Sequence, residues 1–403
     1  MPKKASPLFL LGPAFVAAIA YVDPGNVAAN LTAGARYGYL LLWVLVLANV
    51  IAVLVQYQSA KLGIVTGRSL PELLGERLRT GPRRVYWVQA ELVAAATDIA
   101  EVIGGAIALH LLFGIPLLLG GVIIGVASML LLLVQSHRSQ RSFELVIITL
   151  LGVILVGFVS GLFFTEIDGP ALAGGLFPHF EGTDSVLLAT SMLGATVMPH
   201  VIYLHSALAR DRHGVTEDVG RIRTLLRATR VDVGLALLLA GAINISMLLL
   251  AAAALGGVDG TDSIEGAHAA IVTALGPTIG VIFAIGLLAS GLASTSVGTY
   301  AGSAIMGGLL KLRVPLLARR LVTLIPALAV LAAGIDPTTA LVLSQVVLSF
   351  GIPFALIPLV ALASSTKLMG EFANRPWLKW SGWVSTAAIV VINVLLIVLV
   401  VIG

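Results

Sequence analysis

The stretch YVDPGNVAAN, residues 21–30, interrupts a segment that otherwise has the composition of a membrane-spanning helix. It places the carboxylate of Asp23, a proline, a glycine and the amide of Asn26 in consecutive positions. A charged side chain or an unbonded backbone carbonyl is costly in hydrocarbon, so such a row must face protein, water or a bound ion. The break therefore predicts a polar centre inside a bundle of membrane helices.

The composition is that of a membrane protein. Of the 403 residues, 58% are hydrophobic and only 11% are charged, which is far from the average of soluble domains. The chain has no cysteine, so disulfides and thiolate metal sites are excluded. Any metal site must therefore use oxygen, imidazole or thioether ligands.

Windows of about 20 apolar residues, the length that crosses a ~30 Å hydrocarbon core, recur along the chain. They predict an all-α polytopic membrane protein with eleven spans: 8–35, 39–63, 84–112, 116–135, 142–165, 187–210, 231–256, 267–297, 318–334, 337–363 and 379–402. We expect one transmembrane domain over 1–403, with a first repeat at about 8–165, a second at about 187–363 and an extra eleventh helix at about 379–402. The N-terminus imitates a signal peptide, but Pro13 interrupts its apolar run, so no cleavage is expected.

The positions of the basic residues predict the orientation. If the N-terminus is cytoplasmic, all of the 24 lysine and arginine residues except Arg36 fall at or near cytoplasmic ends, where the positive-inside rule expects them. The opposite loops carry acidic residues: Glu166, Asp168, Glu181, Asp184, Asp259, Asp262, Glu265 and Asp336. We therefore predict a multi-pass protein of the cell inner (plasma) membrane with an external C-terminus. The net charge of +4 reflects this topology and indicates no nucleic-acid partner.

A second break, GATVMPH at residues 194–200, lies in the sixth span. The two breaks lie in spans that are five positions apart in the chain, which is typical of a five-plus-five inverted repeat whose first helices are both discontinuous. Pro24 has no N–H for the carbonyl of Ala20. Pro199 likewise leaves the carbonyl of Ala195 without its helical donor. Both carbonyls are therefore predicted to be available to a bound ion.

These groups together predict a cation site. Asp23, the side-chain oxygen of Asn26 and the two carbonyls are hard oxygen ligands. Met198, beside the second break, adds a thioether that does not suit Mg²⁺ or Ca²⁺ but is acceptable to softer ions. The set therefore favours Mn²⁺, Fe²⁺, Co²⁺ and Cd²⁺, and the sequence does not rank Mn²⁺ against Fe²⁺.

The DPGN of residues 23–26 and the MPH of residues 198–200 resemble the signatures of the Nramp divalent-metal transporters. The wider phrases GPAFVAAIAYVDPGNVAAN and GATVMPHVIYLHSAL extend the likeness, which covers essentially the whole chain. It is greatest to the bacterial manganese-transporter branch, proton-coupled importers of the LeuT-type fold with broken first and sixth helices. The resemblance implies a transporter and no enzyme, no cofactor, and a metal ion and protons as substrates.

The resemblance also implies which residues hold the metal: Asp23, Asn26, Met198, the carbonyls of Ala20 and Ala195, and Gln345 of the phrase LVLSQVVLSFGIPF, which approaches the ion in occluded states. The expected partners are the lipid bilayer and the transported ions. The sequence does not determine the oligomeric state, and a monomer is our working expectation.

The third predicted span carries Glu91, Asp98 and Glu101 on one helix face, since they are seven and three residues apart. Acidic groups at membrane depth must face the bundle and have partners, for which Arg319 and Arg320 are the candidates.

Two interpretations of these acidic residues stay open. One is a structural ion-pair network, and the other is a proton relay that includes Asp23 and His200. The resemblance implies the relay, and one network can serve both purposes. His205 is expected to be a packed or hydrogen-bonded helix residue, because it does not share a face with His200.

Three other functions are compatible with a polytopic membrane protein. A sodium-coupled symporter of amino acids or other organic solutes would share the fold, but a carboxylate with a thioether suits a bare cation better than a zwitterion. An intramembrane metalloenzyme is disfavoured because the chain has no HExxH motif. A channel would show voltage-driven flux without a saturable rate.

Overall fold

The computed structural model describes residues 12–136, 140–256, 258, 260–261, 263–312 and 314–402, with the backbone alone at 131–136, 140–143 and 316. The residues Lys3, Lys4, Arg138, Asp259, Asp262 and Arg313, which entered the predicted topology, lie outside this part.

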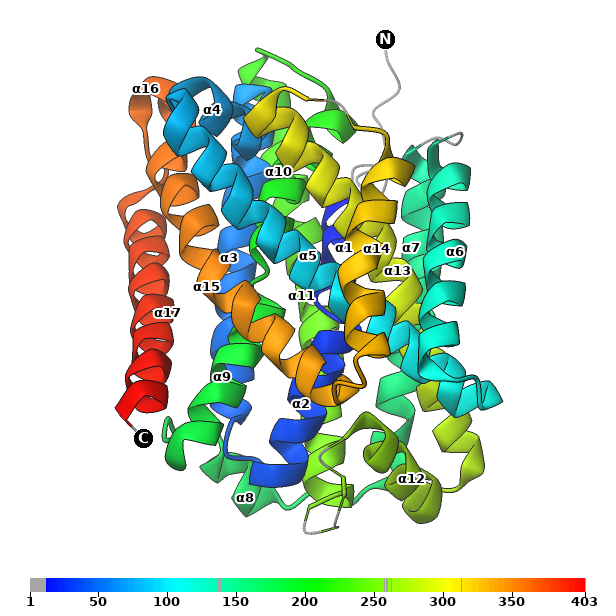
Figure 1. Ribbon diagram of the computed structural model, residues 1–403. Coiled ribbons are helices and arrows are strands. Elements are labelled where there is room, and N and C mark those ends of the chain that lie inside the picture. Colours follow the sequence, from blue (N-terminus) through cyan, green and yellow to red (C-terminus); the bar gives the residue numbers. More distant parts are fainter. Residues whose placement is uncertain are drawn as a thin grey trace.

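Regular structure in the described chain is helical throughout (Figure 1). In order, the elements are α1 (Pro13–Ala20), α2 (Pro24–Tyr37), α3 (Leu42–Thr66), α4 (Leu70–Arg77), α5 (Thr80–Phe113), α6 (Leu117–Ser136), α7 (Gln140–Val159), η2 (Ser160–Phe164), α8 (Gly169–Gly174), α9 (Gly182–Thr196), α10 (Pro199–His213), α11 (Val219–Ala254), α12 (Ile264–Leu275), α13 (Pro277–Leu310), α14 (Leu316–Ala332), α15 (Pro337–Ala363), α16 (Thr366–Met369), η3 (Gly370–Phe372) and α17 (Pro376–Ile402).

Every predicted span corresponds to one of these helices or to a broken pair of them. The first span is α1 followed by α2, and the sixth is α9 followed by α10. By length and composition, eight segments of the described chain could each cross a membrane. The all-α architecture with interrupted first and sixth spans is therefore confirmed.

The predicted span 267–297 is wrong at its start. Helix α12 ends at Leu275, and α13 begins at Pro277. Gly276 between them has a φ of +93°, which breaks the helix, and Pro277 can begin a helix but cannot continue one. The two apolar helices on either side of this turn appear as one segment in the sequence because both are hydrophobic.

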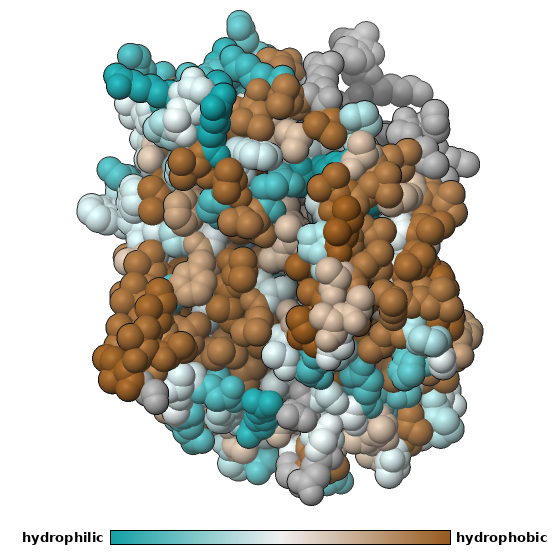
Figure 2. All heavy atoms as spheres, in the orientation of Figure 1, coloured by the Kyte–Doolittle hydropathy of each residue, from teal (hydrophilic) through white to brown (hydrophobic). Residues whose placement is uncertain are grey.

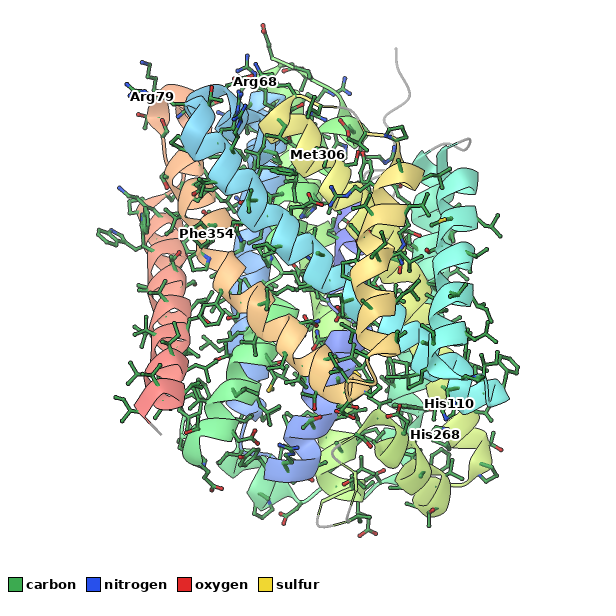
Figure 3. All side chains as sticks on the ribbon, in the orientation of Figure 1. Arg68, Arg79, His110, His268, Met306 and Phe354 are labelled. Carbon is green, nitrogen blue, oxygen red and sulfur yellow. The ribbon has the colours of Figure 1, made fainter. Side chains whose placement is uncertain are left out.

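The two ends of the molecule differ in charge. Arg68 and Arg79 lie at the end with α4 and α16, which we call the basic end, and His110 lies near the opposite end (Figure 3). That opposite end carries α8 and α12, with Asp168 at the start of α8 and Glu265 in the first turn of α12, and is called the acidic end (Figure 1). Hydrophilic residues gather towards both ends, and hydrophobic residues dominate the band between them (Figure 2). This distribution is typical of a protein that spans a bilayer.

Helix α1 is short and is held at its N-terminus by another helix. The carboxylate of Asp232 on α11 accepts hydrogen bonds from the backbone N–H groups of Gly12 and Ala14, both at 3.0 Å. A carboxylate in this place satisfies donors that a helix start leaves free. The half-helix is thereby anchored at the basic end while its other end stops in the middle of the bundle.

Candidate metal site

The first break is built by Asp23, which caps the start of α2. Its backbone is extended, and its Oδ1 accepts the backbone N–H of Asn26 at 2.7 Å. The Asp23 N–H donates in turn to the carbonyl of Ala20 at 3.2 Å. The prediction that Pro24 leaves the Ala20 carbonyl without a donor is therefore wrong, because a shorter turn replaces the missing helical bond.

The other carbonyls of this break receive donors from distant helices. Asn244 on α11 donates to the carbonyl of Tyr21 at 2.9 Å, and Ser290 on α13 donates to that of Val22 at 2.5 Å. Buried backbone carbonyls require such partners. The sequence interpretation missed both side chains, whose only signal is a polar residue inside a long apolar helix.

The second break is less polar. Met198 stands at the start of α10 without a capping hydrogen bond from its side chain, and its thioether is fully buried. The carbonyl of Ala195, whose helical donor would be residue 199, instead accepts from Nδ2 of Asn26 at 3.4 Å. Asn26 therefore joins the two breaks directly.

Gln345 on α15 completes the group. Its Nε2 donates to Oδ2 of Asp23 at 3.4 Å and to the hydroxyl of Ser344 at 3.2 Å. The approach needs glycine on both broken helices, since a Cβ on Gly25 would lie 1.8 Å from Gln345 Nε2 and one on Gly194 would lie 1.9 Å from the Gln345 carbonyl oxygen. The structure thus brings Asp23, Gln345 and the second break together.

The group is closed to solvent. Asp23, Asn26, Met198, Ala195 and Gln345 are all 0% exposed. A cation bound here would have lost most of its water shell, and ligands from the two breaks would have to replace it.

A cavity of about 360 Å³ lies towards the acidic end of the described chain. Thr32, Leu188 and Val342 line it from α2, α9 and α15, the helices that also carry site residues. Arg36 and Asp184 also line this cavity, and they pair at 3.0 Å across α2 and α9. Both side chains are exposed, so the pair holds the two helices together only weakly.

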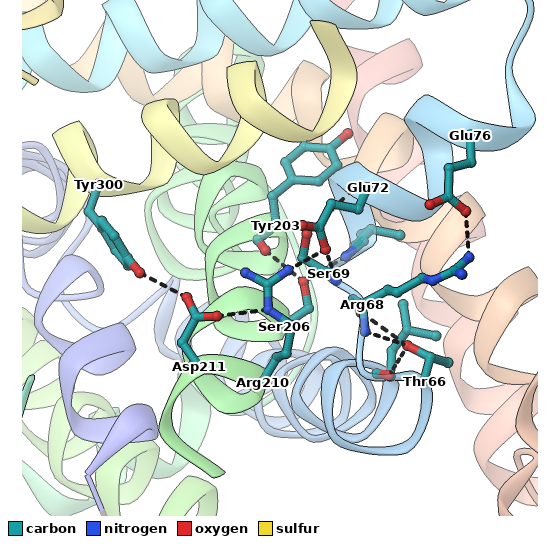
Figure 4. Close-up of polar contacts among 12 residues, drawn as sticks. Thr66, Arg68, Ser69, Glu72, Glu76, Tyr203, Ser206, Arg210, Asp211 and Tyr300 are labelled. Carbon is teal, nitrogen blue, oxygen red and sulfur yellow. Dashed lines mark hydrogen bonds and ion pairs between the residues drawn. The ribbon is translucent and has the colours of Figure 1, made fainter. Parts of the chain in front are cut away.

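A second cavity of about 500 Å³ lies at the basic end, between α4, α10 and α13. Its polar wall is shown in Figure 4: Arg210 on α10 pairs with Glu72 on α4, and its Nε contacts Asp211 at 2.7 Å. Tyr300 on α13 donates to Asp211 at 3.1 Å. These contacts connect the second half of the broken α9–α10 span to two other helices.

The predicted acidic stripe on α5 faces the bundle. Glu91 pairs with Arg319 at 2.8 Å, and Asp98 pairs with Arg320 at 2.8 Å. The two carboxylate oxygens of Glu101 are buried and accept no hydrogen bond in the described chain, but Glu101 interacts electrostatically with Asp98 and Arg320. Two acidic residues of the stripe therefore form ion pairs, and the third lies beside one of these pairs without a hydrogen bond of its own.

The two histidines of α10 point to different helices, as expected. Nδ1 of His200 lies 3.3 Å from the hydroxyl of Thr97, which neighbours Asp98 on α5. Nδ1 of His205 lies 2.8 Å from Oε1 of Gln56 on α3, so His205 is hydrogen bonded. The sequence did not predict a contact for Thr97. Because Thr97 directly precedes Asp98 on α5, its contact with His200 places the second break next to the acidic stripe.

The donor set is unlike that of a catalytic metal centre. In the part of the chain that the structure describes, no three residues of the types His, Cys, Asp and Glu cluster as metal ligands would. The residues at the breaks offer one carboxylate, amides, a thioether and backbone carbonyls. Oxygen and thioether donors together are acceptable to the softer divalent transition ions.

Comparison with known sequences identifies close relatives. A family model described as natural resistance-associated macrophage protein-like matches residues 14–399. The divalent metal cation transporter MntH of Mycobacterium tuberculosis strain H37Rv is 60% identical over 395 residues, which cover 98% of this chain and 92% of that protein. MntH of Bacillus subtilis is 48% identical over 391 residues, covering 96% and 91% of the two chains.

Solved structures agree with this relationship. A crystal structure of the Eremococcus coleocola manganese transporter matches with a TM-score of 0.87 and 32% identity, covering 98% of this chain and 88% of that chain. Mhp1, a nucleobase-cation-symport-1 family transporter, matches with a TM-score of 0.63 at 15% identity, over 96% and 90% of the two chains. The second likeness shows a shared fold alone, and the predicted LeuT-type fold class is confirmed.

Proposed function

Because the chain belongs to the Nramp family, we propose that it imports Mn²⁺, and also Fe²⁺, Co²⁺ and Cd²⁺, with protons. Its relatives are named divalent metal cation transporters, so the chain is a transporter and not an enzyme. The observation that carries the proposal is the meeting of two helix breaks, where Asp23, Asn26 and the Ala195 carbonyl lie together in a closed place.

Asp23 and Met198 divide the recognition of the ion in this proposal. The carboxylate supplies the charge that compensates a dehydrated cation, and the thioether lowers the affinity for Mg²⁺ and Ca²⁺ relative to softer ions. Asn26, Gln345 and the carbonyls at Ala20 and Ala195 supply neutral oxygens. No resident cofactor is expected, and the metal is the substrate.

Protons enter the proposal because the same carboxylate serves both ions. Asp23 must be ionised to bind a metal, so protons and metal compete for it. The proton route runs from Asp23 by way of His200 and Thr97 to Asp98, and Glu101, Glu91, Arg319 and Arg320 extend it along α5 and α14. The contact of His200 with Thr97 supports this connection.

Alternating access is supported by the closed centre between two cavities. We place the acidic end outside the cell and the basic end in the cytoplasm, by the positive-inside rule, in the inner membrane. Opening towards the outside requires the helices around Arg36 and Asp184 to separate. Opening towards the cytoplasm requires α1 and α10 to move at the end where Asp232 and Arg210 hold them.

The test is uptake by proteoliposomes with a pH-sensitive dye inside and an inward proton gradient. We expect saturable Mn²⁺ uptake that acidifies the lumen and is unaffected by added amino acids. Sodium-dependent uptake of an amino acid, inhibited by Mn²⁺, would instead support the organic-solute symporter. Non-saturable flux driven by voltage would support a channel.

A further inference from the structure

Asn30 is fully buried on α2, one helical turn after Asn26, and its only side-chain hydrogen bond within the described chain is to Asn26. Its Nδ2 donates to Oδ1 of Asn26 at 2.7 Å. Its own Oδ1 is buried and accepts no hydrogen bond in the described chain. A buried acceptor without a donor is costly, so an unused amide oxygen next to a proposed ligand requires an explanation.

The present orientation of Asn26 does not suit a cation. Its nitrogen, not its oxygen, is directed at the Ala195 carbonyl, and it also donates to the carbonyl of Tyr21. A metal ion placed beside Ala195 would therefore meet N–H groups of Asn26. Only rotation of this amide by about half a turn would direct Oδ1 at the ion, because an amide has its donor and its acceptor on opposite sides.

Rotation of Asn26 alone would oppose two donors. Its Nδ2 would then face Nδ2 of Asn30, and neither nitrogen can accept a hydrogen bond. If Asn30 also rotates, its unused Oδ1 accepts from Asn26, and a single hydrogen bond between the two amides is kept with its direction reversed.

We infer that Asn30 is a positioning residue that rotates together with Asn26. The Asn26 oxygen then faces the ion when metal is bound, and without metal it faces Asn30 while the Asn26 nitrogen faces the Ala195 carbonyl. This inference rests on the proposed metal site. In the closed structure the Asn30 N–H holds the Asn26 oxygen away from the second break. In the metal-bound state the Asn30 oxygen holds the Asn26 N–H and fixes the ligand from behind, as groups outside a first ligand shell do.

The inference separates two substitutions at one position. Asn30→Leu has neither donor nor acceptor, so Asn26 loses its support, and we expect Mn²⁺ affinity to fall about 10- to 100-fold, the range for outer-shell partners. Asn30→Asp can accept but not donate when ionised, so it favours the metal-ready orientation, and we expect affinity at least equal to wild type. A purely structural role predicts the reverse order, because a buried carboxylate costs more stability than leucine.

The charge introduced by Asn30→Asp could itself raise the Mn²⁺ affinity, and a double-mutant cycle distinguishes this effect from one that acts through Asn26. If Asn30 acts through Asn26, both substitutions lose their effect on affinity in an Asn26→Ala background. The matched control is Asn393→Leu, which removes another buried asparagine, on α17, whose hydrogen bonds are to Ser349 and to neither break. We expect that control to bind Mn²⁺ within about threefold of wild type, because the amide pair is intact.

The experiment is calorimetric titration of the purified full chain with Mn²⁺ at fixed pH. Weak binding by Asn30→Leu, retained binding by Asn30→Asp, and no effect of either in the Asn26→Ala background would support the inference. Wild-type affinity in Asn30→Leu, or a loss that persists in the Asn26→Ala background, would overturn it. If wild type binds Mn²⁺ and Asp23→Ala does not, the proposed function stands even when the inference fails; if wild type binds none, the proposed function fails first.

Discussion

The backbone of the break between α1 and α2 has donors within the break and from α11 and α13, whereas the Ala195 carbonyl of the break between α9 and α10 has its donor on the first break. Asp23 caps α2, and side chains from α11 and α13 donate to the carbonyls of Tyr21 and Val22. Met198 makes no capping bond, and the Ala195 carbonyl finds its donor across the gap on Asn26. The carbonyls of Tyr21 and Val22 in the first break are therefore hydrogen bonded by other helices. The second break has the Ala195 carbonyl and the Met198 sulfur, which a cation could use as ligands.

The largest effect should follow from removing the charge of the first break. Asp23→Ala leaves a bound divalent ion without its carboxylate, and we expect Mn²⁺ uptake to fall at least about 100-fold, more than the loss of an outer-shell partner. Proteoliposome uptake measures it. Asp168→Ala, which removes a carboxylate capping the exposed α8, should keep uptake. Wild-type saturable uptake by Asp23→Ala would show that the Asp23 carboxylate is not needed to bind the metal.

The second break is tested through its sulfur. Met198→Ala should keep Mn²⁺ uptake within about tenfold, since oxygen ligands stay, but should lose preference for Cd²⁺ and admit Ca²⁺. Competition of Ca²⁺ and Cd²⁺ against Mn²⁺ uptake measures this selectivity. Met192→Ala is the matched control, because Met192 is also buried on α9 but precedes the break. Equal selectivity in the two variants would show that the thioether does not contact the ion.

The second break also connects to the proton route, by way of His200 and Thr97. Asp98→Asn should therefore reduce lumen acidification per Mn²⁺ severalfold while leaving Mn²⁺ affinity within about threefold, because Asp98 touches neither break. Dual recording of Mn²⁺ uptake and internal pH checks this. Glu91→Gln removes the partly exposed member of the stripe and should have a smaller effect. If lumen acidification per Mn²⁺ is unchanged in Asp98→Asn, the acidic stripe is a structural network and not a proton relay.

The smallest effect concerns the anchoring of α10 at the basic end. Burial raises the pKa of Glu72, but hydrogen bonds from the Ser69 N–H and from Arg210 outweigh burial and hold it below its usual value. A lowered folded pKa means that this stabilisation is present above the unfolded pKa and is lost as the pH falls through the folded one.

Glu72→Gln should therefore lower the Tm by a few degrees at most at neutral pH, and the difference from wild type should shrink as the pH falls below the ordinary glutamate pKa of about 4.3. Tryptophan fluorescence on heating measures it. Glu76→Gln, whose Arg68 partner is exposed, should change the Tm less. A Tm difference between wild type and Glu72→Gln that grows as the pH falls would contradict the lowered pKa of Glu72.

The sequence predicted the two breaks because proline and glycine act locally. Pro24 and Pro199 interrupt their helices wherever those helices are packed, and a carboxylate at membrane depth requires a polar surrounding. The sequence also predicted the ion pairs of Glu91 and Asp98, because charges buried at membrane depth need opposite charges. That these residues ligate a metal or carry protons stays a prediction.

The rest depended on three-dimensional packing. Nothing local indicates that Asn244 and Ser290 reach the first break, that Thr97 meets His200, or that the Glu101 carboxylate accepts no hydrogen bond in the described chain. Hydrogen bonds between helices far apart in the chain depend on rotation and register, which apolar spans do not encode locally. The orientation of the Asn26 amide belongs to this class, because it is decided by Asn30 and by the Ala195 carbonyl on another helix.

The most direct test of the shared site is anomalous X-ray diffraction from crystals of the full chain soaked with Cd²⁺, compared with crystals of Met198→Ala. We predict one peak between the two breaks, in contact with both the Asp23 carboxylate and the Met198 sulfur, that weakens strongly in the variant. A peak bound by the first break alone and unchanged in Met198→Ala, or a peak elsewhere in the molecule, would contradict the claim that both breaks hold one ion.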